Sequence, residues 1–247
     1  MMQLPSFKEP IQVALIGSSG GIGEALLKLL LSSQDVSGID TFSRSTHKFE
    51  AISHSAYRHF QCNITEPSEL ESLCHDLKGT RYHCLINTTG LLHTDAIKPE
   101  KTLKSLELDA LEQVFKVNTF APALVIKHFF PLMVTSQKAV MSFLSARVGS
   151  ISDNRLGGWY AYRSSKSALN MLIKCASIEV QRQRKNLSII GLHPGTVDTN
   201  LSKPFQSGAK KLFSPEESAH YLLKVIENLA PEDSGNVLDW QGKIIEP

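Results

Sequence analysis

The chain has 247 residues, of which 42% are hydrophobic and 20% charged, and its formal net charge is +2. This length suits one large α/β domain or two small ones, and the near-neutral charge argues against an extended nucleic-acid surface. The four cysteines show neither a C-x-x-C pair nor zinc-ligand spacing, and the nine histidines show no metal-binding pattern, so we expect free thiols and no metal.

Short apolar runs recur along the chain and alternate with segments of helical periodicity. The runs predict strands at 11–16, 36–43, 57–62, 82–87, 139–144, 187–192 and 236–239. The periodic segments predict helices at 24–33, from the turn at 63–67 to residue 77, over 105–135 as two helices, at 160–184 and at 215–229. Within 105–135, we expect Asn118 near the junction and Pro122 and Pro131 at local breaks.

This alternation of strands and helices predicts an α/β fold, a doubly wound parallel sheet of the Rossmann type in a single domain over residues 1–247. Ligands of such sheets bind outside the carboxyl ends of the strands. The polar and turn-forming residues of this chain fall at six of those ends, which favours a binding site there. They are Gly17–Gly23, Arg44, Asn63, Asn87 with Gly90, Ser145, and Pro194 with Gly195.

The glycine-rich turn after the first strand has the spacing Gly17-x-x-x-Gly21-x-Gly23. Glycines allow close backbone approach, and the following helix presents free N–H groups and its positive dipole end, so the turn suits a dinucleotide pyrophosphate. It is not the G-x-G-x-x-G fingerprint, and no Gly-Lys-Ser/Thr follows to make it a Walker loop. A glycine turn without a ligand is the alternative interpretation.

Tyr162 and Lys166 open the long helix four residues apart, which places them on one helical face. A cation this close favours the phenolate, so we expect the lysine to lower the pKa of the tyrosine. Taken alone the spacing is common, and an exposed surface pair would show it too.

Several motifs together resemble, in order and spacing, the short-chain dehydrogenase/reductase family. The resemblance covers nearly the whole chain. Residues 147–150 and 157–163 are similar to the branch of C-factor-like proteins and sniffer-type carbonyl reductases. The motifs of the family are Gly17–Gly23, Asn87-Thr88-Thr89-Gly90, Asn118, Ser145, Tyr162-x-x-x-Lys166 and Pro194-Gly195.

The resemblance implies a nicotinamide-dependent oxidoreductase that interconverts a carbonyl and a secondary alcohol. Tyr162 would be the general acid in reduction and the general base in oxidation. Lys166 would lower its pKa and hold the nicotinamide ribose, Ser145 would hydrogen-bond the substrate oxygen, and Asn118 would hold a water that links Lys166 to solvent. A hydroxyl donor and a proton source both stabilise the charge that hydride transfer builds on a carbonyl oxygen.

Two features depart from the family pattern. Thr88 and Thr89 stand where the family usually has Asn and Ala, and the larger side chains alter the fit near the adenosine. Ser145 lies seventeen residues before Tyr162, farther than is common, and Ser150, twelve residues before it, is the competitor. We prefer Ser145 because it ends a strand, whereas Ser150 falls in a loop.

Cofactor preference depends on the end of the second strand, where a carboxylate would bind a ribose 2′-OH. Ser43 occupies that position, Arg44 follows it, and Asp40 lies too early, in the strand interior. An arginine engages a phosphate bidentately, so we expect NADP(H) to be preferred over NAD(H). Asn63 replaces an Asp of the family and could still hydrogen-bond the adenine.

The residues that we expect to contact the cofactor come from the six strand ends and the long helix. They are Gly17, Ser19, Gly20, Gly21, Ile22, Gly23, Arg44, Asn63, Ile64, Asn87, Thr88, Thr89, Gly90, Tyr162, Lys166, Pro194, Gly195 and Val197. The polar segment around 196–211 occupies the position of the family's substrate lid.

The expected partner is a small carbonyl or alcohol, with a homodimer or homotetramer as an open possibility. No apolar run approaches the ~18 residues of a membrane span, and residues 1–10 lack a signal-peptide pattern, so we expect a cytoplasmic protein. The alternative function is an NAD(P)-binding signalling protein of the C-factor type with dispensable catalysis. The intact set of Asn118, Ser145, Tyr162 and Lys166 favours the enzyme.

Overall fold

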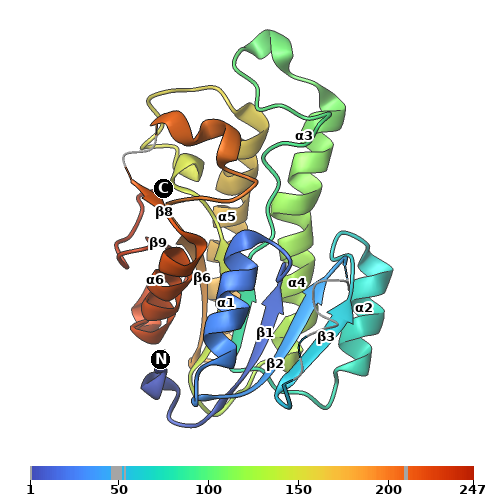
Figure 1. Cartoon of the computed structure of the whole chain (residues 1–247), viewed down its shortest axis with the longest axis vertical. Helices are drawn as coiled ribbons and strands as arrows, with labels where there is room; N and C mark the ends of the chain where they lie inside the picture. Colours follow the sequence, from blue (N-terminus) through green and yellow to red (C-terminus); the bar gives the residue numbers. More distant parts are fainter. Residues whose placement is uncertain (1, 46–51, 53, 209–210) are drawn as a thin grey trace.

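The computed structural model describes residues 2–45, 52, 54–208 and 211–247 (Figure 1). Its main sheet has seven strands in the order β3-β2-β1-β4-β5-β6-β9, and every neighbouring pair is parallel. The expected doubly wound Rossmann-type sheet is confirmed. The strands are β1 (Ile11–Ile16), β2 (Val36–Ser43), β3 (Tyr57–Gln61), β4 (Cys84–Asn87), β5 (Ala139–Leu144), β6 (Leu187–His193) and β9 (Val237–Asp239).

Helices cover both faces of this sheet (Figure 1). In β1, Val13 and Leu15 pack toward α1 and α6, whereas Ala14 and Ile16 pack toward α2, α4 and α5. Strands buried on both faces read as continuous apolar runs, which is the pattern that predicted them. The helices are α1 (Gly21–Leu31), α2 (Pro67–Asp76), α3 (Leu108–Phe115), α4 (Ala121–Phe129), α5 (Tyr160–Gln183) and α6 (Pro215–Glu227).

Shorter helical segments join these elements. The 3-10 turns are η1 (Pro5–Phe7), η2 (Leu103–Ser105), η4 (Phe130–Leu132), η5 (Arg147–Gly149), η6 (Lys203–Gly208) and η7 (Pro231–Asp233). Helix boundaries shift by a few residues from those expected. The last glycines of the Gly17–Gly23 turn already belong to α1, so the helix N-terminus lies closer to β1 than the leucine pattern indicated.

A π-helical turn, η3 (Lys116–Phe120), joins α3 to α4 and holds Asn118. The sequence predicted a junction there and attributed a break to Pro122. Pro122 lies in the first turn of α4, directly after the π turn, so the irregularity falls where the proline was expected to interrupt the helix. The irregularity comes before it, and π turns inside helices are frequent at functional sites.

A second, two-stranded sheet brackets the segment expected to form the lid. It pairs β7 (Thr196–Val197) with β8 (Leu212–Phe213) in parallel, and η6 lies between them. Ala209 and Lys210 of the expected lid lie outside the described residues. Ser214 then starts α6 with a capping box in which its side chain accepts from the Glu217 N–H.

No helix in the described part of the chain combines the length and apolar character needed to cross a membrane. Within that same part, no three His, Cys, Asp or Glu side chains gather as a metal site would require.

Asp40 lies inside β2, and its carboxylate is buried in a charged network. Arg58 donates to both carboxylate oxygens, at 2.8 Å and 2.6 Å, and the Tyr82 hydroxyl donates to one of them at 2.6 Å. Its position in the strand interior is as expected, and the acid serves to tie β2 to β3 and β4.

Removing the arginine of this network should destabilise the fold. Arg58→Ala leaves the buried Asp40 carboxylate without its cation, and we expect a loss of about 1–3 kcal/mol. This loss is smaller than that for breaking a fully buried ion pair, because 54% of the Arg58 side chain is exposed to solvent. Urea denaturation measures it, with the exposed Arg155→Ala as the control. Equal stability of the two variants would contradict the role given to the network.

Candidate active site

The glycine turn after β1 is built so that backbone, rather than side chains, faces the end of the sheet. Gly17 has a φ of +82°, and a Cβ at that position would lie 2.7 Å from Thr88 Oγ1. A Cβ on Gly23 would collide with the Gly17 carbonyl, and one on Gly21 would lie 2.8 Å from a methyl of Thr199. Space therefore favours glycine at all three positions, and at Gly17 the backbone conformation favours it as well.

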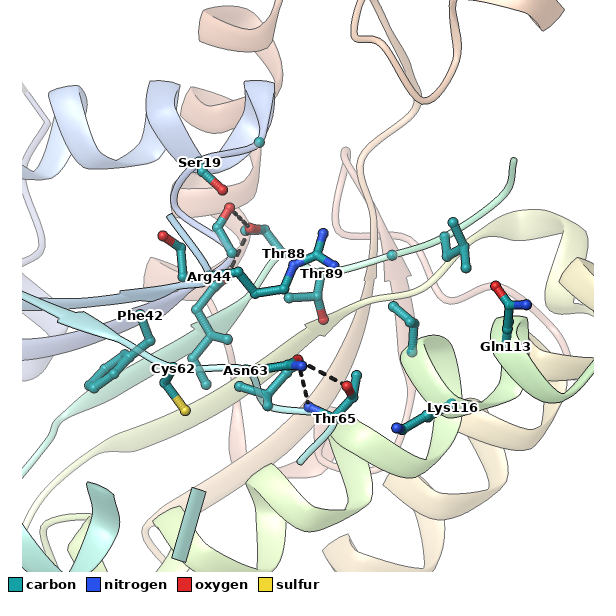
Figure 2. A pocket seen from close by; sticks show the side chains of 18 of the residues that line it. Ser19, Phe42, Arg44, Cys62, Asn63, Thr65, Thr88, Thr89, Gln113 and Lys116 are labelled. Carbon is teal, nitrogen blue, oxygen red and sulfur yellow. Dashed lines mark hydrogen bonds between the residues drawn. The ribbon is translucent and has the colours of Figure 1, made fainter. Parts of the chain in front are cut away.

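A cavity of about 430 Å³ opens at this turn, between the carboxyl ends of β1, β2 and β4 (Figure 2). Nine of the expected cofactor residues line it, namely Gly17, Ser19, Gly20, Arg44, Asn63, Ile64, Thr88, Thr89 and Gly90. The others lie elsewhere. Gly21, Ile22 and Gly23 form the first turn of α1, Asn87 ends β4, Tyr162 and Lys166 belong to α5, and Pro194, Gly195 and Val197 follow β6.

The two threonines of the β4 turn fasten it to the glycine turn. Thr88 Oγ1 donates to the carbonyls of Ile16 and Gly17, at 2.9 and 3.0 Å. Thr89 donates to Asn87 Oδ1 through its N–H at 3.0 Å and through its hydroxyl at 2.7 Å. Thr88 thus ties the β4 turn to the glycine turn, and Thr89 ties the β4 turn to the side chain of Asn87.

The cavity has features that fit a dinucleotide. Asn87 does not line the cavity but directly precedes the lining residue Thr88, and its buried Nδ2 has no hydrogen-bond partner among the described residues, so a donor is left beside the cavity. Asn63 Oδ1 accepts from the Thr65 N–H at 3.2 Å and its hydroxyl at 2.9 Å, which fixes the Asn63 side chain at the cavity wall (Figure 2).

Two cationic side chains, Arg44 and Lys116, line the cavity (Figure 2). Arg44 is exposed and follows β2, whose last residue, Ser43, donates its hydroxyl to the Ser45 carbonyl at 2.7 Å. Lys116 comes from η3 and pairs with Glu66 at 2.8 Å. The end of β2 therefore has Ser43 at the position where an acid would bind a ribose 2′-OH, and a cation, Arg44, directly after it.

Helix α5 carries Tyr162 and Lys166 on the face that meets the end of β5. Lys166 is buried, and its Nζ donates to the Leu144 carbonyl at 2.7 Å. The same Nζ lies 5.8 Å from the centre of the Tyr162 ring. The expected pairing of the two side chains on one helical face is present.

The direction of the tyrosine pKa shift in this structure is opposite to the one expected. Burial raises the pKa of Tyr162 from 10.0 to about 12, and it lowers the pKa of Lys166 from 10.5 to about 7. Both shifts have one cause, because a dry environment disfavours the phenolate and the ammonium alike. The protein alone does not acidify Tyr162.

Asn118 is fully buried in the π turn and fastens the β4 loop to α5. Its side chain accepts from the Leu91 N–H at 2.7 Å and donates to the Leu91 carbonyl at 2.8 Å. It also donates to Ser165 Oγ at 3.0 Å, and Ser165 donates to the Tyr162 carbonyl at 2.8 Å. Asn118 is thus joined to the helix turn that carries Tyr162 and Lys166.

The two candidate serines have different surroundings. Ser145 follows β5 directly, and its hydroxyl donates to Asn170 on α5 at 2.6 Å. Ser150 lies in the loop after η5, where its hydroxyl accepts from the Asp153 N–H at 3.1 Å and contacts Ser152 Oγ at 3.3 Å. Ser145 is therefore the serine that faces the catalytic helix.

The start of α5 is fixed from outside the helix. Trp159 precedes it with a φ of +51°, an uncommon conformation for a residue with a side chain. Glu100 is buried, and its carboxylate accepts from the Ala161 N–H at 3.2 Å. An acid at this end complements the helix dipole.

The segment between β7 and β8 is held near Tyr162 by aromatic contacts. The Phe205 ring lies 5.0 Å from the Trp159 ring and 5.5 Å from the His93 ring, and Trp159 lies 6.2 Å from Tyr162. His93 also contacts the Asn200 carbonyl at 3.2 Å. His93 therefore packs against the expected lid.

Sequence reasoning did not identify Asn170 or Lys116, and it placed Phe205 in the expected lid without its contacts at the site. Asn170 had a signal, since it lies four residues after Lys166 and eight after Tyr162, on the same helical face. Lys116 and Phe205 had none, because the π turn and the path of the lid segment bring them to the site.

The chain belongs to the short-chain dehydrogenase family, whose family model matches residues 12–210. This confirms the family that the motifs indicated. A relative, 1-hydroxy-2-glutathionyl-2-methyl-3-butene dehydrogenase of Rhodococcus sp. (strain AD45), is 31% identical over 186 residues, covering 74% of this chain and 77% of the relative. C-signal of Myxococcus xanthus is 33% identical over 132 residues, covering 53% of this chain and 75% of that protein.

Solved structures share the fold over almost the whole chain. The NADPH-bound carbonyl reductase from chicken fatty liver has a TM-score of 0.84 and 27% identity, covering 97% of this chain and 100% of the other. The carbonyl reductase Sniffer of D. melanogaster has the same TM-score and coverage at 24% identity, which supports the fold alone. The expected C-factor-like and sniffer-type relatives are thus both found, and the chain is an oxidoreductase of this family.

The buried lysine should make stability depend on pH. Between pH 7 and 10, the unfolded chain holds a proton on Lys166 that the folded chain lacks, because its folded pKa is about 7. Folding stability should therefore rise with pH, by about 1 kcal/mol per unit, relative to a Lys166→Met variant. Denaturant titrations of both proteins at several pH values test this. Parallel curves for the two proteins would mean that Lys166 keeps an ordinary pKa.

Proposed function

We propose that this protein is an NADP(H)-dependent oxidoreductase that interconverts a carbonyl and a secondary alcohol. One observation carries the proposal, the position of Gly90. Gly90 lines the cavity at the glycine turn, and a Cβ on it would lie 3.7 Å from Lys166 Nζ and 3.8 Å from Asn118 Oδ1. Through Gly90, the cavity that fits a dinucleotide therefore adjoins Lys166 and Asn118, two of the residues that fit carbonyl chemistry.

In the proposed reaction, the bound cofactor supplies a hydride to the carbonyl carbon. Tyr162 donates its phenolic proton to the carbonyl oxygen, which becomes the hydroxyl of the alcohol. Ser145 donates a hydrogen bond to the same oxygen as its charge develops. The glycine turn and the N-terminus of α1 would hold the pyrophosphate, and Lys166 would hold the nicotinamide ribose.

The raised pKa of Tyr162 suits this role in the reducing direction. A phenol with a pKa of about 12 keeps its proton at neutral pH and so begins the reaction as an acid. Once it has given up the proton, the phenolate lies beside Lys166, and the ammonium form of that lysine would stabilise it. A positive charge on the oxidised cofactor would act in the same direction.

The preference for NADP(H) rests on Arg44 at the cavity wall and on the absence of an acid from the end of β2, residues 43–45, as described above. A 2′-phosphate there would meet a guanidinium, and no carboxylate of this strand end would repel it. The NADPH bound to the chicken carbonyl reductase supports this choice.

C-signal, at 33% identity, supports a second candidate, a signalling protein of which cofactor binding is the functional part. That role does not require a proton donor beside the cavity. The two candidates differ in whether turnover follows binding.

Tyr162→Phe tests the reaction. The variant keeps the ring and loses the acid, so NADPH should still bind, as measured by its fluorescence, while turnover falls by about 10²–10⁴-fold. The assay is NADPH oxidation with a panel of aldehydes, ketones and quinones. Full activity in Tyr162→Phe would show that Tyr162 is not the acid. A wild-type protein that binds NADPH but turns over no carbonyl or alcohol would favour the signalling candidate.

Arg44→Ala tests the cofactor preference. Loss of the guanidinium should weaken NADPH binding by about 10-fold or more, since a charge-assisted contact contributes about 1.5–3 kcal/mol, and leave NADH binding nearly unchanged. Fluorescence titration with both cofactors measures the two dissociation constants. Arg182→Ala, an exposed arginine in the last turn of α5, is the control and should change neither. Equal weakening of both cofactors by Arg44→Ala would overturn the assignment.

A further inference from the structure

Two hydrogen bonds, one made by the backbone and one by the hydroxyl, fix the position of Ser145 and the orientation of its side chain. Its backbone N–H donates to the Leu192 carbonyl of β6 at 2.8 Å, which fixes the residue at the end of the sheet. Its hydroxyl is buried and donates to Asn170 Oδ1 at 2.6 Å. Asn170 is therefore the side chain that decides how the Ser145 hydroxyl is oriented.

Asn170 belongs to a regular arrangement on α5. Tyr162, Lys166 and Asn170 are spaced by four residues and follow one another along one helical face. Lys166 holds the Leu144 carbonyl and Asn170 holds the Ser145 hydroxyl, so successive helix turns bind successive residues at the end of β5. Gly149 permits this packing, because a Cβ there would lie 2.8 Å from Lys166 Cβ and 3.2 Å from Asn170 Nδ2.

The observed hydrogen bond conflicts with the proposed use of Ser145. A serine hydroxyl has one hydrogen, and here that hydrogen goes to Asn170. A hydroxyl that is already donating cannot donate to a substrate oxygen as well. The side-chain amide resolves the conflict if it turns by 180°, because its oxygen and nitrogen have nearly the same shape.

We propose that Asn170 is a positioning residue whose amide Nδ2 donates to Ser145 Oγ in the working enzyme, which releases the Ser145 hydrogen for the substrate oxygen. This inference rests on the proposed function. In this arrangement Ser145 accepts one hydrogen bond and donates another, and each strengthens its neighbour in a buried chain. In the part of the chain that the structure describes, Asn170 Nδ2 has no hydrogen-bond partner, so the turn of the amide breaks no second bond.

The matched variant is Asn170→Asp, which has the same shape but, when ionised, only accepts. It preserves the hydrogen bond seen in the structure and holds the Ser145 hydrogen away from the substrate. A purely structural tie between strand and helix would survive this change with full activity. The positioning role predicts that kcat falls by about 10-fold with little change in KM, because the lost contact is made only in the transition state.

A pH profile and a double-mutant cycle separate this role from the effect of a new charge near Lys166. Protonation of the introduced carboxylate restores a donor, so the deficit in kcat of Asn170→Asp relative to wild type should shrink as the pH falls.

The double-mutant cycle uses Ser145→Ala, which alone should lower kcat by about 10²–10³-fold. In that background Asn170→Asp should cost nothing further. An equal additional loss in the Ser145→Ala background would overturn the proposal.

A second measurement does not depend on turnover. The side-chain amide resonance of Asn170, assigned by its absence in Asn170→Asp, should exchange slowly with solvent in the NADP⁺ complex and lose this protection in Ser145→Ala. Unchanged exchange in Ser145→Ala would show that Nδ2 does not donate to Ser145 and would overturn the proposal. A wild type with no activity on any carbonyl or alcohol would refute the proposed function, whereas an active wild type with a fully active Asn170→Asp would refute only the role of Asn170.

Discussion

The hydrogen bond from Lys166 Nζ to the Leu144 carbonyl is the constraint on which the candidate site depends. It attaches the catalytic face of α5 to the carboxyl end of β5, and it does so through an amine that is almost fully removed from water. Burying an amine is costly unless it is hydrogen-bonded. With this bond made, Tyr162 on one side and Asn170 on the other are brought to the same edge of the sheet as Ser145.

Backbone atoms of the glycine turn after β1 lie at the same edge of the sheet, on the side away from α5. Glycine at positions 17, 21 and 23 brings the first turn so close to Thr88, Thr199 and its own carbonyl groups that no Cβ fits. Thr88 then donates to Ile16 and Gly17, which fixes the β4 turn to the β1 turn. Gly90, two residues further on, faces both the cavity and Lys166. The cavity and the Tyr162–Lys166 pair on α5 are therefore joined by a few residues after β4.

Most of the fold could be predicted from the sequence because its determinants are local. Apolar runs of strand length mark each buried strand, and the turn residues mark the strand ends at which ligands bind. The candidate site was predictable where a motif has fixed spacing, as for Tyr162 and Lys166. It was not predictable where tertiary packing decides. The π turn of Asn118 and the approach of Phe205 to Trp159 have no sequence signature.

The pKa shifts of Tyr162 and Lys166 were also not predictable from the sequence, because tertiary packing decides them. Helical spacing gives the distance between two charges but not the dielectric around them, and burial is the larger effect for Tyr162 and Lys166. The expectation from spacing alone therefore had the wrong direction for Tyr162. Asn170 was predictable in part. Its spacing places it on the same helical face as Tyr162 and Lys166, but only the packing of β5 against α5 brings it to Ser145.

The raised pKa of Tyr162 and the lowered pKa of Lys166 both suit the proton transfers of the proposed reaction. In the reducing direction Tyr162 must start protonated, and a pKa of about 12 ensures this. After the proton has gone to the substrate, Tyr162 must be protonated again before the next turnover. Lys166, with a pKa of about 7, both takes up and releases a proton at neutral pH, which a lysine with an ordinary pKa does poorly. Asn118 is hydrogen-bonded through its side chain to the Leu91 backbone and to Ser165, so it also holds the π turn against α5. In the proposed reaction, burial would therefore suit Tyr162 to act as the acid and Lys166 to return its proton.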